Sequence, residues 1–135
     1  MSAVEEVRRA AALMRERAQA ATPGAWRDSA VDGSNRYAAL VSDVPPRRPG
    51  GGEGWHYEAD YGGYLIGESL TKHDRAHIAS WSPPVALAVA NWLDDAANWA
   101  EEEEAHFLSD RGPLAVVRAY LGTPDRVVVD DEAKP

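Results

Sequence analysis

The break at Pro23 and Gly24, directly after an amphipathic helical segment, constrains the fold of this chain more than any other sequence feature. Proline is not tolerated in a helix interior and glycine accepts the positive φ of a turn, so the helix has to end there. Trp26 then begins a segment in which short β-prone runs alternate with glycine, aspartate and asparagine. The chain is therefore expected to pass from a helix into a sheet at this point.

The N-terminal helix is predicted to begin at Ser2, because Ser2 and Glu5 have the spacing of a capping box. Apolar residues then recur at spacings of three and four along one stripe, which consists of Val4, Val7, Ala11, Met14 and Ala18. The stripe is narrow and rich in alanine and valine. It favours close packing against a second helix, either inside the domain or in a dimer.

The middle of the chain is predicted to form two or three antiparallel strands. Strand candidates lie near Trp26, over residues 36–41 and over residues 64–67, and residues 31–35 have the composition of a hairpin turn. Residues 45–54 are rich in proline and glycine, so we expect an exposed, mobile loop there.

The part of the chain beyond Thr71 is predicted to be helical. We expect a short helix from residue 71 or 72 to residue 81, a long helix after Ser82, and a last helix from residue 113 to residue 121. Trp81, Trp92 and Trp99 stand at helical positions among alanine and valine. This setting favours a place in the core or in a helix–helix interface over ligand stacking.

Together these segments predict an α+β fold with an N-terminal helix, a small antiparallel sheet of two or three strands and a C-terminal helical half. The chain has 135 residues, the size of one ordinary domain, which we place at residues 1–123. Residues 124–135 are expected to form a tail or an added edge strand.

The charge balance restricts the partners. Twenty-two acidic and fourteen basic residues give a net charge of -8, which argues against nucleic acid and anionic membranes and favours a basic protein surface. The chain has no cysteine, so it has neither a disulfide framework nor a thiolate nucleophile, which fits a reducing compartment. We see no signal peptide and no apolar stretch of membrane-spanning length, so a cytoplasmic location is expected.

Two sequence blocks resemble a known group of proteins. The first is Ala-Thr-Pro-Gly-x-Trp and the second is Asp-x-x-His-Ile-Ala, and their residues here include Thr22, Pro23, Gly24, Trp26, Asp74, His77, Ile78 and Trp81. Their order around the helices resembles small uncharacterised proteins of actinobacteria and their phages and, more loosely, the Ead-like proteins of temperate phages. Members commonly have proline where this chain has Ala25. The resemblance implies a phage or prophage accessory role and assigns no catalytic residue.

One candidate metal site lies in the second block. His73 and His77 are four residues apart on a predicted helix, a spacing that can present two imidazoles to one ion, with Asp74, His56 or His106 as a third ligand. The alternative, which we favour, is that these residues cap or pair locally, because such spacings often arise by chance.

A candidate ligand-binding surface lies on a glycine-rich segment, where aromatic residues are dense. It consists of Trp55, His56, Tyr57, Tyr61 and Tyr64, with Arg47 and Arg48 as neighbouring cations. Such rings form either a contact surface or the wall of a small-ligand site, although packing onto the helices is the more common use. The glycines lack the order of the known phosphate-binding loops.

Three functions remain open from the sequence, and no cofactor is predicted. The first is a non-enzymatic accessory protein that binds a host or phage protein, and both a monomer and a homodimer are compatible with its sequence. The second is a small-ligand or nucleotide sequestering protein that uses the aromatic segment. The third is a metal-dependent hydrolase around His73, Asp74 and His77. The acidic run at residues 101–104 suits a basic partner, although such runs usually form a solvated helix face.

Overall fold

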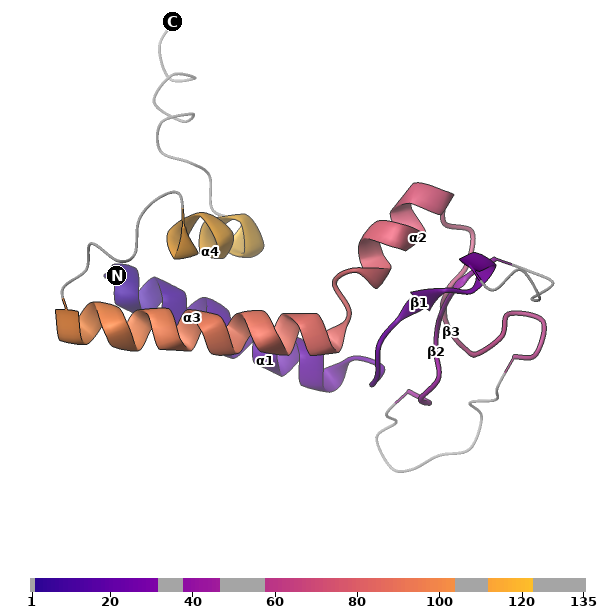
Figure 1. Ribbon diagram of the computed structural model, residues 1–135, viewed down its shortest axis with the longest axis horizontal. Coiled ribbons are helices and arrows are strands. Elements are labelled where there is room, and N and C mark those ends of the chain that lie inside the picture. The colour runs from indigo at the N-terminus through magenta and orange to yellow at the C-terminus, as the bar shows by residue number, and fades with distance from the viewer. Residues whose placement is uncertain (1, 32–37, 47–57, 104–111, 123–135) are drawn as a thin grey trace, which may run out of the picture. The chain divides into compact units, whose positions relative to one another are not determined.

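The computed structural model describes residues 2–31, 38–46, 58–103 and 112–122, and it confirms the predicted α+β fold. Its elements, labelled in Figure 1, are the helices α1 (Ala3–Ala20), α2 (Lys72–Ala79), α3 (Pro83–Glu103) and α4 (Pro113–Leu121), the short helix η1 (Ser29–Val31), and the strands β1 (Arg27–Asp28), β2 (Leu40–Ser42) and β3 (Tyr64–Gly67). The contacts divide the chain into two compact units. The helical unit comprises Met1–Met14 and Val89–Pro135, and the sheet unit comprises Arg15–Ala88.

The helical unit begins with the predicted capping box. The Ser2 hydroxyl accepts a hydrogen bond from the Glu5 backbone N–H at 3.1 Å, and the Glu5 carboxylate accepts one from the Ser2 N–H at 2.9 Å. Both contacts satisfy N–H groups that a helix start leaves without intrahelical partners. This end of α1 is therefore specified by two residues three positions apart, as the sequence predicts.

The core of the helical unit lies where α1, α3 and α4 meet. Figure 1 shows α1 and α3 side by side and running in opposite directions. The buried side chains are Val7, Ala10, Ala11 and Met14 from α1, Ala90, Leu93, Ala97 and Ala100 from α3, and Leu114 and Val117 from α4. Alanine on both facing helices lets the two backbones approach closely. Of the two partners left open for the α1 stripe, the structure shows a helix of the same chain.

The sheet unit is built on three antiparallel strands in the order β1-β2-β3. Arg27 faces Val41 across the first pair, and Val41 faces Leu65 across the second. The predicted pairing of the first two strands is confirmed, and the third strand matches the sequence prediction residue for residue. Of the predicted hairpin turn at residues 31–35, residues 32–35 lie outside the described residues. So do residues 47–54 of the expected loop and the tail at 124–135.

The corner between α1 and the sheet is held by the residues of the first sequence block. The Trp26 indole N–H donates to the Thr22 carbonyl at 2.8 Å, and the Ser42 hydroxyl donates to the Pro23 carbonyl at 2.6 Å. Gly24 has φ +89°, and a Cβ there would lie 3.0 Å from the Ser42 Oγ. The block therefore has a structural role, because it turns the chain and ties the end of α1 to β2.

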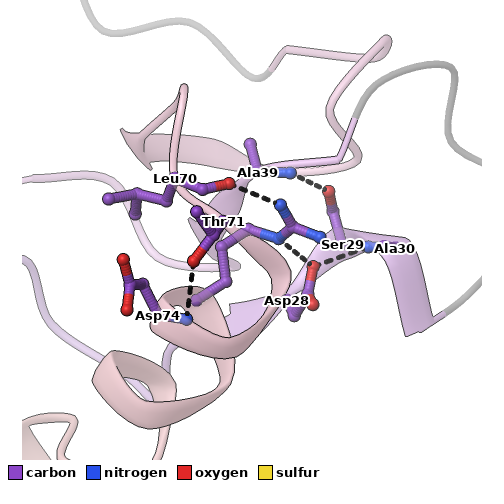
Figure 2. A network of polar contacts seen from close by, with 8 residues as sticks. Asp28, Ser29, Ala30, Ala39, Leu70, Thr71 and Asp74 are labelled. Carbon is purple, nitrogen blue, oxygen red and sulfur yellow. Dashed lines mark hydrogen bonds and ion pairs between the residues drawn. The ribbon is translucent and has the colours of Figure 1, made fainter.

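Helix α2 is fastened to the sheet by one ion pair rather than by a buried apolar face, since none of its residues is buried. The Nε of Arg75 donates to Asp28 Oδ1 at 2.9 Å, and its Nη1 donates to the Leu70 carbonyl at 2.8 Å. Both charged side chains are only 11% exposed. Figure 2 shows this network together with the N-cap of α2, where the Thr71 hydroxyl accepts from the Asp74 N–H.

Candidate functional site

Helix α3 carries three parallel stripes, and each has a different environment. The central stripe, made of Ala90, Leu93, Ala97 and Ala100, is buried in the core of the helical unit. One neighbouring stripe is tied to α1, because Arg8 donates to Asn98 at 3.0 Å and to the Glu101 carboxylate at 2.6 and 2.7 Å. The stripe on the other side of the core carries two large exposed side chains, Trp92 and Trp99.

Trp92 is 46% exposed and Trp99 is 62% exposed. The expectation that these residues lie in the core is therefore wrong, and the same holds for Trp81, which is 40% exposed. In the core of the helical unit, α3 contributes Leu93 and three alanines, which share the core with small side chains of α1. Small side chains at a helix–helix contact favour close packing, which leaves the larger indoles outside. An interface with another molecule remains a prediction for these tryptophans.

The exposed stripe borders a pocket of about 350 Å³. Its lining consists of Trp92, Asp95, Ala96 and Trp99 from α3 and Pro113 from the first turn of α4. The four α3 residues follow the spacing i, i+3, i+4 and i+7, so they share one helix face. We name this face, with its pocket, the tryptophan face.

All charged residues of α3 are acidic. The helix has Asp94, Asp95 and three glutamates but no lysine or arginine. The hydrogen bond from Arg8 lowers the pKa of Glu101 and raises that of Arg8 itself, so this glutamate is already matched with a cation. Asp95 differs, because its side chain makes no ion pair with any described residue. The face thus combines two indoles with a carboxylate that is open to a cation.

The predicted aromatic cluster is described only in part. Trp55, His56 and Tyr57 lie outside the described residues, as do Arg47 and Arg48. Tyr61 and Tyr64 are half-buried, and the Tyr61 hydroxyl donates to Glu68 at 2.5 Å. The structure therefore assigns Tyr61 a hydrogen bond inside the sheet unit, and ligand binding by the whole cluster stays a prediction.

The predicted metal ligands lie on the surface of α2, where His73, Asp74 and His77 are all exposed. Among the described residues, no group of three histidine, cysteine, aspartate or glutamate side chains is placed where it could hold a metal ion. His56 and His106, the other ligands considered, lie outside the described residues. A metal site that includes them stays a prediction.

The second sequence block is distributed over α2 and the turn that follows it. Ile78 is half-buried, whereas Asp74, His77 and Trp81 are exposed. Arg75, which lies inside this block, makes the ion pair that holds the helix. Arg75 therefore has the clearest structural role in the block, although it occupies one of the variable positions (x) of the motif.

Of the two environments that the sequence favours for Trp92 and Trp99, the structure excludes the core and leaves the helix–helix interface a prediction; nothing in the sequence distinguishes Asp95 from its acidic neighbours. A usable signal was present in the sequence. Two apolar stripes run along α3 one residue apart, one made mostly of alanine and the other carrying the indoles. A helix that packs closely against an alanine-rich partner buries its small residues, so the large ones remain outside.

The fold and the tryptophan face define an α+β protein that displays an acidic, aromatic helix surface. Comparisons with protein-family models, with curated proteins and with solved structures find no match. Among the described residues, no helix has the length and apolar character needed to cross a membrane.

Proposed function

We propose that this chain is a non-enzymatic phage or prophage accessory protein that binds a basic segment of a host or phage protein in the host cytoplasm. The observation that carries the proposal is the tryptophan face of α3, where two indoles are exposed beside acidic residues. Large apolar side chains that gather on a surface commonly mark interaction sites. The phage setting rests on the two sequence blocks that resemble phage-encoded proteins.

The physical argument for a protein partner starts from the tryptophans. Tryptophan is enriched among the residues that dominate binding energy, because it buries a large area and loses few rotatable bonds. Trp92 and Trp99 lie seven residues apart on α3, so both can contact one elongated partner. The surrounding carboxylates would accelerate encounter with a basic segment and disfavour acidic ones.

The same charges make a second copy of this chain a poorer partner for this face. Two α3 helices packed through the tryptophan face would bring the Asp95 carboxylates of the two copies towards each other. Like charges across an interface cost binding energy. A homodimer, if formed, is therefore expected to use another surface.

The test is capture of binding proteins from a lysate of a phage-infected actinobacterial host, with three versions of the full chain as bait. These are the wild type, Trp92→Ser, and Trp81→Ser as the matched control, because Trp81 is exposed to a similar degree but lies in the sheet unit. We expect a protein with a basic segment to bind the wild type and Trp81→Ser and to be lost with Trp92→Ser. The purified partner should then bind more weakly as salt is raised.

Two results would contradict the proposal. One is that no protein is retained above the background of the bare resin. The other is that the retained proteins bind Trp92→Ser as well as they bind the wild type. Circular dichroism of each bait establishes that the variants keep the helical content of the wild type, so that a loss of capture reports the surface rather than the fold.

A further inference from the structure

We infer that the pocket of the tryptophan face receives an arginine side chain of the partner, which stacks on Trp92 and Trp99 and pairs with Asp95. This inference rests on the proposed function, because it names the group by which the partner would be anchored. The observations that carry it are the composition of the pocket, the spacing of the indoles and the carboxylate of Asp95, which makes no ion pair with another described residue.

The spacing suits a cation. Seven residues of helix place Trp92 and Trp99 about 10 Å apart along the axis of α3. For rings that extend at the level of their own Cα atoms, a cation midway between them would lie about 5 Å from each along the axis, within the roughly 6 Å over which a cation is attracted to the face of an aromatic ring. Asp95 lies between the two indoles in sequence and lines the same pocket. One cation can therefore contact both rings and the carboxylate together.

The lining favours arginine over lysine. Apart from Asp95, the pocket is formed by two indoles, an alanine and a proline, so an entering group meets mainly apolar surface. A guanidinium is more weakly hydrated than an ammonium, stacks flat on an indole and can donate two parallel hydrogen bonds to one carboxylate. An ammonium has none of these three advantages.

The size of the pocket agrees with this occupant. The volume of about 350 Å³ lies at the lower end of the range for small-molecule pockets, which is roughly 300–1,000 Å³, so one side chain fits better than a large cofactor. Pro113 begins α4, whose N-terminus contributes partial positive charge and so disfavours a cation, but the full negative charge of Asp95 in the same lining outweighs it.

The experiment uses the full chain labelled at its tryptophan indole nitrogens and follows the indole N–H resonances by NMR. The probes are N-acetyl-arginine amide, its neutral planar counterpart N-acetyl-citrulline amide, and N-acetyl-lysine amide. Each resonance is assigned with single tryptophan-to-phenylalanine variants. Trp81 is the internal control, because it is also exposed but lies in the sheet unit.

We expect the arginine amide to shift the Trp92 and Trp99 resonances in a saturable way and to leave Trp81 unchanged. Binding of the citrulline amide should be about 10-fold weaker, because it lacks the charge. The Asp95→Asn variant should bind the arginine amide about 5-fold more weakly, because the ion pair is lost.

Three results would overturn the inference: no shift with the arginine amide, equal affinity for the arginine and citrulline amides, or tighter binding of the lysine amide. Its failure is distinguishable from failure of the proposed function. If these titrations fail while capture of a basic partner still depends on Trp92, the partner binds this face with another group. If the titrations succeed and no partner is captured, the pocket recognises arginine and the proposed function is wrong.

Discussion

Replacing Leu93 by alanine should destabilise the protein more than replacing the larger Trp99, although both residues lie on α3. Leu93 is fully buried among the alanines that join α1 to α3. Its neighbours in the cluster are mostly alanines, whose short side chains cannot extend into the space that the leucine leaves. Truncation of buried leucines typically costs about 3–5 kcal/mol, with the larger values where a cavity persists. We expect about 3 kcal/mol for Leu93→Ala.

The corresponding cost for Trp99→Ala follows from its exposure of 62%. The area that its side chain does bury is roughly 80 Å², which corresponds to about 2 kcal/mol at the usual value per unit area. Alanine regains about 0.5 kcal/mol through its higher helix propensity, and no internal cavity forms. The net cost should be about 1.5 kcal/mol, or half that of Leu93→Ala.

The assay is urea unfolding followed by far-UV circular dichroism, which does not depend on the tryptophan that is removed. The free energy of unfolding of each variant is obtained from its midpoint and slope, and the slopes should equal that of the wild type. If Trp99→Ala costs as much as Leu93→Ala or more, the assignment of the two faces of α3 is wrong. The tryptophan face would then be part of the core, and both binding proposals would lose their basis.

Three further predictions concern the corner, the ion pair of the sheet unit and the ion pair of the helical unit. Gly24→Ala should lower stability by about 1–2 kcal/mol in thermal or urea unfolding, because the φ of +89° is strained for alanine and the added Cβ meets neighbouring atoms at 3.0 and 3.1 Å; an unchanged or higher stability would contradict the corner geometry. Arg75→Met should cost about 2 kcal/mol by the same measurement, because Asp28 keeps its charge at 11% exposure without its cation; a variant as stable as the wild type would show that the pair does not hold α2. Arg8 lowers the pKa of Glu101 in the folded protein, so the stabilisation by this ion pair is complete above the ordinary glutamate pKa of about 4.3 and is lost as the pH falls through the lowered pKa. The melting temperatures of the wild type and Arg8→Gln should therefore differ at pH 7 and converge towards pH 3. A difference that stays constant with pH would refute the assignment of this ion pair.

The features predicted correctly from the sequence are those that depend on residues close together in the chain. The capping box needs only Ser2 and Glu5, and both of its hydrogen bonds are present. Gly122 ends α4 with φ +72°, the left-handed conformation that favours glycine at this position. The corner at Pro23 and Gly24 is likewise a local consequence of two residues with special backbone properties. Elements and their ends could therefore be placed without knowledge of the tertiary structure.

The contacts that fasten the elements together could not be placed in this way. Arg75 pairs with Asp28, which is 47 residues away, and nothing in the spacing of either residue identifies the other. The pair of Arg8 with Glu101 spans 93 residues. Long-range pairs of this kind follow from the packing of the elements, so an acidic run read from sequence alone gives no indication of which carboxylate has a partner. For the same reason, nothing in the sequence indicates that Asp95 makes no ion pair with another described residue.

The orientation of α3 shows how size matching selects one of two apolar stripes. Helical periodicity allows either the stripe with Leu93 or the stripe with Trp92 to face α1, because they are one residue apart. The choice follows from the partner helix, where Ala10 and Ala11 permit a close approach that alanine-rich α3 can match and tryptophan cannot. A purely structural helix would be expected to carry polar residues on its remaining surface. The two exposed indoles depart from that expectation, and departures from consistent local patterning concentrate at functional sites. The proposed binding through this face would account for tryptophan at two positions of α3 that its own core does not use.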